Sequence, residues 1–383
     1  MSLRNYLDKI KPHFEKGGKW ERLHSTFEAF ESFAYTPNTV TRRGSHVRDA
    51  VDMKRTMIIV VIALLPALLF GMWNIGHQTA LLYPGQVADT FWGCLGFGFL
   101  KMLPLIVVSY VVGLAIEFLF AELRHEEVSE GYLVTGLIIP MVVPVTLPLW
   151  QLALAVAFAV VIGKEVFGGT GMNFLNVALV ARAFLFFGYP SHMGGDSVWV
   201  ARPYGFAGDA VTGATPLGEL MAGGTPSATP WEMFLGLVPG STCETSVLAI
   251  LLGAALLLLT QIVNWRTLLA VFLGGGLMAL LFNAIGANEY MRLPFYYHYL
   301  MGGFAFGAVF MATDPVTSAQ TNAGRWVYGL LIGAFAVMLR VLNPAYPEGM
   351  MLSILLMNCF APLIDHVVVQ RNIKRRLKRA AAK

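Results

Sequence analysis

A polar segment with the sequence Asp-Ala-Val-Thr-Gly-Ala-Thr-Pro begins at Asp209 and has the composition of an attachment point. Thr215 offers a hydroxyl, and Gly213 and Ala214 before it leave room for a phosphate or another chain to approach closely. Thr212 adds a second hydroxyl to the same segment. An ordinary turn capped by Asp209 has the same composition, so the spacing alone leaves both interpretations open.

A second segment, Gly-Gly-Thr-Gly-Met-Asn-Phe-Leu-Asn, runs from Gly168 to Asn176 and precedes an apolar run. Glycines such as Gly169 before a helix leave backbone N–H groups free for an anion or for the polar rim of a ligand. Asn173 and Asn176 share one helical face, so their two amides could bind the edge of a heteroaromatic ring. Helix capping and a hydrogen bond between helices are the alternative use of these amides.

Three acidic residues, Glu117, Asp314 and Asp365, lie within or at the ends of apolar runs. A carboxylate is costly inside a membrane and marks a functional site by default, and carboxylates suit a hard cation such as sodium, or a proton. The three acids are therefore candidates for the pathway of a cation such as sodium, or of a proton. A structural ion pair is the alternative for each of them, with three possible partners: Lys101, Arg182 and Arg340.

The composition shows what class of protein positions these residues. Of the 383 residues, 56% are hydrophobic and 13% are charged, and the mean hydropathy is +0.62. A soluble globular protein has about 25% charged residues, so we expect an all-α polytopic membrane protein, with the lipid bilayer as a partner and no nucleic acid. Intrinsic disorder, a coiled coil and a disulfide-rich scaffold are excluded.

The cysteines limit the metal chemistry of the chain. Cys94, Cys243 and Cys359 form no Cys-x-x-Cys pair, which excludes a four-thiolate iron–sulfur cluster or a zinc ribbon held by this chain alone. We therefore expect no metal cluster. The sequence also has no Gly-x-Gly-x-x-Gly dinucleotide motif after a strand, so we expect no dinucleotide site of that kind in this chain.

We expect about ten membrane helices, because a span needs roughly 20 mainly apolar residues. The expected spans are 56–73, 93–120, 131–146, 148–163, 174–189, 245–263, 267–285, 298–313, 326–342 and 349–367. The third span ends in a series of prolines and the eighth ends at Asp314-Pro315, so both are expected to be interrupted.

Basic residues predict the orientation, because cytoplasmic flanks carry the excess of Lys and Arg. The segment 1–55 contains 11 of the 27 Lys and Arg residues, and the tail after residue 370 contains 7. Both termini are therefore expected in the cytoplasm. The loop 190–244 contains only Arg202 and is expected on the outer side. Within 1–55, residues 20–35 have apolar side chains at spacings of three and four, which predicts an amphipathic helix on the membrane surface, on a partner or on the protein's own cytoplasmic face.

An internal repeat relates the two halves of the chain. Aligning 132–148 with 299–315 gives six identities, which are Tyr, Leu, Gly, Val, Thr and Pro, so the third span matches the eighth. Five spans in each half give the halves opposite orientations, and ligand sites in such folds lie at the repeat interface near interrupted helices. We expect a cytoplasmic segment 1–55, a first repeat 56–189, an outer loop 190–244, a second repeat 245–367 and a basic cytoplasmic tail 368–383.

The segment ending at Thr215 resembles the [Ser/Thr]-Gly-Ala-Thr signal at which a flavin transferase attaches FMN to the final threonine. Four further motifs, FGGTGMNFLN, GGFAFGAVFMATDPV, NPAYPEGMM and FAPLIDHVVVQRNIKRRL, are similar to those of the NqrB/RnfD family. That family contains the NqrB subunits of sodium-translocating NADH:quinone oxidoreductases and the related RnfD subunits. The resemblance covers essentially the whole chain, and the motifs together are highly specific.

The resemblance implies ten helices in two inverted five-helix repeats, as in urea-channel-like proteins. It implies FMN bound covalently through a phosphoester to Thr215, within the Asp209–Thr215 motif, and non-covalent riboflavin near Asn173, Asn176 and Gly169. Ubiquinone would be reduced near Gly113, although Leu114 follows where a second glycine is expected. The acids listed above would match the residues associated with sodium movement.

The resemblance also implies a multi-subunit complex in the bacterial inner membrane. The partners would be a subunit with flavin and an iron–sulfur centre that oxidises NADH, a second subunit that carries FMN, and small membrane subunits. The RnfD subunit of an Rnf-type ferredoxin:NAD oxidoreductase is the nearest alternative, but the long N-terminal segment favours the quinone-reducing enzyme. A solute channel of the same fold is a further alternative, but a channel has no use for a flavin-attachment threonine. A purely structural anchor subunit is another alternative, and tests on Thr215 and Asn173 would distinguish it from a subunit that binds flavin.

Overall fold

The computed structural model describes residues 3–15, 18–20, 23–35, 43–45, 53–126, 128, 130–205, 213–343, 346 and 348–381. Over these residues the chain is helical and contains no β-strand, which confirms the all-α membrane fold. Six of the described helices are long and apolar enough to cross a membrane: α3 (Met53–Leu82), α4 (Phe91–Arg124), α6 (Leu149–Gly163, followed by a 3-10 turn Glu165–Phe167), α12 (Trp265–Ile285), α15 (Asn322–Leu342) and α16 (Met350–Ala381).

Shorter helices complete the two halves. Three of them are apolar: α5 (Tyr132–Met141), α7 (Val177–Gly188) and α11 (Val247–Leu259). The expected eighth span is divided into α13 (Tyr297–Leu300), α14 (Phe304–Phe306) and a π-helical turn (Gly307–Met311). Outside the apolar set lie α1 (Leu3–Ile10), α2 (His24–Ala34), α8 (Pro190–Met193), α9 (Pro216–Met221) and α10 (Pro230–Leu235). The exact number of ten spans stays a prediction.

The two interrupted segments make equivalent contacts, which supports the internal repeat. The hydroxyl of Tyr132 donates to the carbonyl oxygen of Ser109 at 2.9 Å, and that of Tyr299 donates to the carbonyl oxygen of Phe272 at 2.7 Å. Each acceptor lies four residues before a glycine, Gly113 or Gly276, whose missing side chain leaves the space that the tyrosine occupies. Non-helical backbone at membrane depth is tolerated where it is buried in protein, as it is here.

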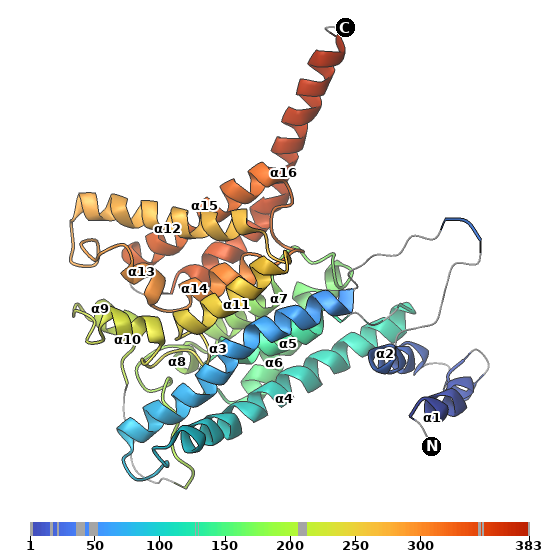
Figure 1. Cartoon of the computed structure of the whole chain (residues 1–383), viewed down its shortest axis with the longest axis horizontal. Helices are drawn as coiled ribbons and strands as arrows, with labels where there is room; N and C mark the ends of the chain where they lie inside the picture. The colour runs from blue at the N-terminus through green and yellow to red at the C-terminus, as the bar shows by residue number, and fades with distance from the viewer. Residues whose placement is uncertain are drawn as a thin grey trace.

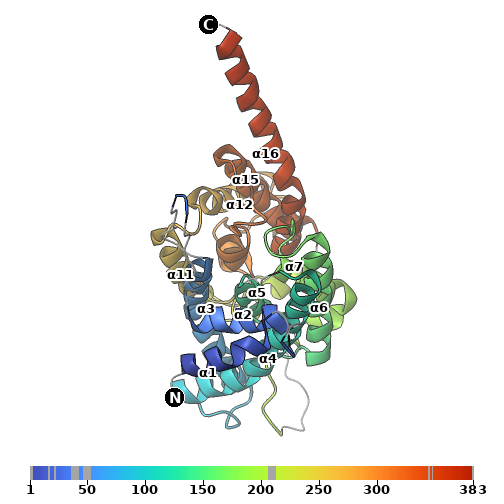
Figure 2. The ribbon, with the colours of Figure 1, turned by 90° about the vertical axis from the view of Figure 1, so that its right-hand side faces the viewer.

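The helices form two groups that face each other. The long helices α3 and α4 pack side by side, and α12, α15 and α16 pack together in the other part of the molecule (Figure 1). The view turned by 90° shows α16 continuing well beyond the other helices (Figure 2). The apolar part of α16 was expected to end near residue 367, but the basic residues that follow are good helix formers and extend the helix to Ala381.

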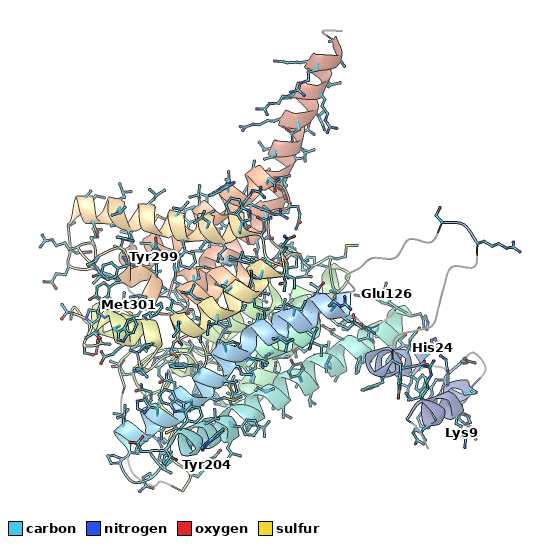
Figure 3. All side chains as sticks on the ribbon, in the orientation of Figure 1. Lys9, His24, Glu126, Tyr204, Tyr299 and Met301 are labelled. Carbon is cyan, nitrogen blue, oxygen red and sulfur yellow. The ribbon has the colours of Figure 1, made fainter. Side chains whose placement is uncertain are left out.

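The amphipathic helix α2 packs on the protein's own surface. The backbone N–H and the hydroxyl of Thr26 both donate to Glu122 of α4 at 2.8 Å, and the rings of Phe30 and Phe118 lie 5.9 Å apart. Phe30 remains 60% exposed, so α2 also keeps an apolar surface for a membrane or a partner. Figure 3 shows His24 at the opposite end of the molecule from Tyr204, which lies in the loop expected on the outer side.

Candidate functional site

Thr215 lies at the start of a helix with its hydroxyl held in place. It is the N-cap residue of α9, and its Oγ1 accepts a hydrogen bond from the backbone N–H of Gly218 at 3.1 Å. The N–H of Gly213 donates to the carbonyl oxygen of Asp196 at 2.9 Å, which fixes the chain just before it. Ala214 between them is half-buried. The expected contributors Asp209 and Thr212 lie outside the described residues.

Thr215 lines a cavity of about 490 Å³, here called the Thr215 cavity. This volume is within the roughly 300–1,000 Å³ of small-molecule sites. Its walls are mainly apolar and are formed by Phe186, Met193, Trp199, Leu217, Met301 and Met351, among others. Its polar side chains include Arg182, Glu244, Tyr346 and Glu348.

Arg182 connects two carboxylates at the polar end of the Thr215 cavity. Its guanidinium lies 2.7 Å from Glu244 and 2.7 Å from Glu348, and it also donates to the hydroxyl of Ser241 at 3.3 Å. A side chain on Gly303 would approach both carboxylates within 3 Å, so glycine at this position lets the two acids converge. Such a pairing is required, because a buried charge is tolerated only when it is neutralised.

Sequence reasoning missed three residues of this polar end, namely Glu244, Tyr346 and Glu348. Arg182 was one of three possible partners for the acids within the spans, and it pairs with acids from two loops instead. The sequence does signal Glu348, because it stands in the Asn-Pro-Ala-Tyr-Pro-Glu-Gly segment immediately before an apolar helix. Glu244 follows a run of small residues and carries no comparable signal.

A second cavity, of about 120 Å³, contains the candidate amides and is here called the Asn176 cavity. Asn173, Asn176, Thr170 and Asp314 line it together with apolar side chains from α3, α5 and α11. Asn176 caps α7 by accepting from the N–H of Leu179 at 3.2 Å, and it donates to Asp314 at 3.4 Å. Asn176 therefore caps a helix, and its hydrogen bond goes to Asp314 in the segment between helices; a ligand at the two amides stays a prediction.

Only part of the segment from Gly168 to Asn176, which precedes α7, lines the Asn176 cavity. Asn173 donates its amide to the carbonyl oxygen of Leu175 at 3.0 Å. Gly169 adopts a φ of +87°, which favours glycine, and lies beside Arg124 and Glu165, whose side chains form an ion pair at 2.9 Å. Gly169 is not among the residues that line the Asn176 cavity.

The three candidate acids have different surroundings. Asp314 lines the Asn176 cavity, and it also accepts from the hydroxyl of Thr317 at 3.0 Å. Glu117 is buried in an ion pair with Lys164, whose side chain lines the Asn176 cavity. Asp365 accepts from the backbone N–H of Gln320 at 2.6 Å and so holds the far end of the segment that follows Asp314.

The other two possible partners, Lys101 and Arg340, make contacts of other kinds. The ammonium of Lys101 lies 3.7 Å from the centre of the Tyr204 ring, and the guanidinium of Arg340 donates to the backbone carbonyls of His298, Met301 and Glu348. Neither pairs with one of the three candidate acids in the part of the chain that the structure describes. No group of three His, Cys, Asp or Glu side chains that could hold a metal ion occurs within the described ranges.

Gly113, the candidate for the quinone neighbourhood, has a structural reason to be glycine. It lies on α4 directly against the ring and hydroxyl of Tyr132, where any side chain would collide with that ring. Gly113 is buried inside the helix bundle. A quinone near this residue would therefore contact its neighbours on α4 and not Gly113 itself.

The whole chain matches known proteins. A protein of Pseudomonas aeruginosa (strain LESB58), named as the B subunit of Na(+)-translocating NADH-quinone reductase, is 48% identical, over 99% of this chain and 100% of its own length. Proteins of the same name from Chromohalobacter salexigens and Azotobacter vinelandii are each 47% identical; these matches cover 100% and 99% of this chain, and 98% and 100% of the relatives. The model of the family described as NQR2, RnfD, RnfE matches residues 40–374. The chain therefore belongs to the NQR2, RnfD, RnfE family.

Proposed function

We propose that the chain is the membrane subunit of a sodium-translocating NADH:ubiquinone oxidoreductase, with FMN covalently bound to Thr215. The observation that carries the proposal is the position of Thr215, whose hydroxyl accepts from Gly218 and which lines a 490 Å³ cavity with mainly apolar walls. FMN bound there would supply the capacity to accept and donate electrons. The names of the relatives support the quinone-reducing enzyme over the Rnf alternative.

The residues around Thr215 fit a phosphoester. Gly213 and Ala214 carry little side chain, and Gly218 leaves the space next to Oγ1 open. On attachment by a flavin transferase, Thr215 Oγ1 would form the bond to phosphorus and lose its proton, while the leaving group of the flavin donor departs from the same phosphorus. The cavity beyond Thr215 would then shield the ring from water.

We place a second, non-covalent flavin, riboflavin, near Asn173 and Asn176. The hydroxyl of Thr170 supports this location, because it is buried beside the Asn176 cavity without a hydrogen-bond partner within the described structure. The cavity volume of about 120 Å³ is below the range of small-molecule sites, so binding a three-ring ligand requires its walls to move apart. Asn176 would then exchange its contact with Asp314 for one with the ligand.

The sodium pathway is proposed through Glu117 and Asp314, with Asp365 at its cytoplasmic side. Lys164 connects the first two, because it contacts Glu117 and lines the cavity that contains Asp314. The proposed partners are the NADH-oxidising subunit, the second FMN-carrying subunit and the small membrane subunits, in the bacterial inner membrane. A ubiquinone site near α4 and the N-terminal segment completes the proposal.

The experiment that tests the proposal is in-gel fluorescence after denaturation, with a flavin transferase expressed in the same cells. Wild-type protein is expected to fluoresce and Thr215→Val is expected to lose the signal completely. Thr229→Val is the matched control, because Thr229 is also an N-cap threonine followed by proline, in the same loop. A wild-type band without fluorescence would exclude the covalent flavin and favour a solute channel.

A further inference from the structure

Lys164 presents a positive charge to Glu117, an acid of the proposed sodium pathway. Lys164 directly follows the last residue of α6, and Glu117 lies on α4. The two side chains form an ion pair and are 6% and 4% exposed. A lysine ammonium is a compact point charge on a flexible stem, whereas a guanidinium is a rigid planar fork. The ammonium of Lys164 therefore stands at this carboxylate much as a small monovalent cation would.

The charged residues next to this ion pair are paired with each other. Glu165 forms an ion pair with Arg124 of α4 at 2.9 Å, and Arg124 also donates to the backbone carbonyl oxygen of Glu165. The ammonium of Lys164 lies 6.0 Å from the centre of the Tyr132 ring. In the part of the chain that the structure describes, Glu117 is the one carboxylate in ion-pair contact with Lys164.

A second acid lies at the same cavity and is held by uncharged donors. Asp314 and Lys164 both line the Asn176 cavity. The carboxylate of Asp314 accepts from the hydroxyl of Thr317, the backbone N–H of Val316 and the amide of Asn176. No Lys, Arg or His within the described ranges forms an ion pair with it. When both acids are ionised, two carboxylates share one lysine, so one further monovalent cation neutralises the group.

We propose that Lys164 is a tethered competitor of the transported cation. Its ammonium holds Glu117 while no cation is bound, and it moves to Asp314 at the Asn176 cavity when a cation takes its place. The inference rests on the proposed sodium pathway. Lys164 has backbone angles of −132° and −62° for φ and ψ, outside the helix, and its four-carbon stem allows the ammonium to change partners.

The competition has two consequences for the cation. It lowers the apparent affinity, because a cation binds only the fraction of molecules in which the carboxylate of Glu117 is free. It also transmits binding, because a cation at Glu117 sends the ammonium to neutralise Asp314. The contacts at the Asn176 cavity therefore depend on whether a cation is bound at Glu117.

The test is the sodium dependence of quinone reduction by NADH in the purified complex, with choline chloride keeping the ionic strength constant. Lys164→Gln removes the competitor and is expected to lower the half-saturating sodium concentration severalfold. Sodium is also expected to raise the Tm of this variant more than that of the wild type, because Glu117 then has no other cation. A merely structural ion pair would lose stability and activity without responding to less sodium.

Two further variants separate the charge from the fold. Lys164→Arg keeps an ion pair with Glu117, and a guanidinium binds a carboxylate through two parallel N–H donors, so the half-saturating sodium concentration is expected to rise. Arg124→Gln is the matched control, because it removes the neighbouring ion pair between α4 and the 3-10 turn after α6. It is expected to leave the half-saturating sodium concentration unchanged.

The outcomes distinguish the inference from the proposed function. An unchanged half-saturating concentration in Lys164→Gln and Lys164→Arg would overturn the inference, as would an increase in Lys164→Gln or an equal decrease in Arg124→Gln. A Glu117→Gln variant with the sodium dependence of the wild type would instead overturn the proposed sodium pathway.

Discussion

At the scale of single residues, the ion pair of Lys164 with Glu117 makes a direct prediction. The two side chains are 6% and 4% exposed. Removing one partner of a buried pair leaves the other charge uncompensated and costs about 3–5 kcal/mol. We therefore expect Lys164→Met to lower the thermal stability of the detergent-purified protein strongly, and Lys164→Met with Glu117→Gln to recover most of it. Thermal unfolding monitored by size-exclusion chromatography measures both, and wild-type stability in Lys164→Met would contradict the pairing.

Gly218 controls the space around the proposed attachment oxygen. A Cβ on Gly218 would lie 3.3 Å from Thr215 Oγ1 and 3.4 Å from Asp196 Oδ1, which crowds the position that a phosphorus atom would take. We expect Gly218→Ala to reduce covalent flavin, as in-gel fluorescence per mole of protein, severalfold. Gly194→Ala is the control, because Gly194 lines the same cavity but its Cβ would meet its nearest atom at 3.7 Å. Equal labelling of both variants would contradict the proposed role of Gly218 in keeping this space open.

The site residues that could be predicted from the sequence interact with near neighbours in the chain, whereas those that could not be predicted interact with residues far away in it. Thr215 and Asn176 stand in local motifs, and their capping roles depend on neighbours three residues away. Arg182 is bound to Glu244 and Glu348, which follow it by 62 and 166 residues. A pairing over such distances depends on how the helices assemble, so periodicity and local motifs cannot predict it.

At the scale of elements, the contact between a helix glycine and the tyrosine of an interrupted segment occurs once in each half. A Cβ on Gly276 would collide with the hydroxyl of Tyr299, whose ring carbon lies 3.6 Å away. A Cβ on Gly113 would collide with both the hydroxyl and the ring of Tyr132. The two contacts are therefore equivalent in position but differ in how closely the ring approaches.

This difference predicts which substitution can be rescued. We expect Gly276→Ala and Gly113→Ala each to destabilise the purified protein, by about 1–3 kcal/mol or more as for other overpacked cores. Tyr299→Phe removes the colliding oxygen and is expected to restore most of the stability of Gly276→Ala. Tyr132→Phe leaves the colliding ring and is not expected to rescue Gly113→Ala. Thermal unfolding of the single and double variants measures the loss of stability and its recovery. Equal recovery in the two pairs would contradict the difference in how closely the two rings approach.

Element boundaries show where hydropathy stops being informative. The sequence predicts the apolar part of α16 but not its length, because the basic residues after 370 favour helix without being apolar. The interruption at 312–321 follows from Asp314-Pro315, but its shape depends on the carboxylates of Asp314 and Asp365, which bind backbone N–H groups at its two ends. The first feature depends on propensity and the second on side-chain hydrogen bonds, and neither is visible in a hydropathy profile.

At the scale of the whole molecule, α7 connects the two cavities. Asn176 at its start contacts Asp314, and Arg182, about 9 Å further along at 1.5 Å per residue, contacts Glu348. Both partners belong to the second half of the chain. A displacement of α7 would therefore change the contacts at both cavities together. Coupling between a redox centre and an ion requires a conformational difference that both sites sense, and α7 meets that geometric requirement.

The orientation of the chain, which the distribution of basic residues predicts, decides which cavity faces which side of the membrane. Thr225 is exposed in the loop after α9, and Ala380 is exposed near the end of α16. The test uses a Cys359→Ala background, which removes the exposed cysteine and leaves the buried Cys94 and Cys243. In cells with a permeabilised outer membrane, we expect a membrane-impermeant maleimide to label Thr225→Cys.

Ala380→Cys is expected to react with the same maleimide after the inner membrane is disrupted and not before. The reason is that an odd number of crossings must separate a flavin on the outer face from basic residues on the inner face, and the second repeat is expected to supply five. Labelling of both positions in intact cells would mean an even number of crossings between them. Such a result would place Thr215 and the basic tail on one side of the membrane, and the predicted orientation would be wrong.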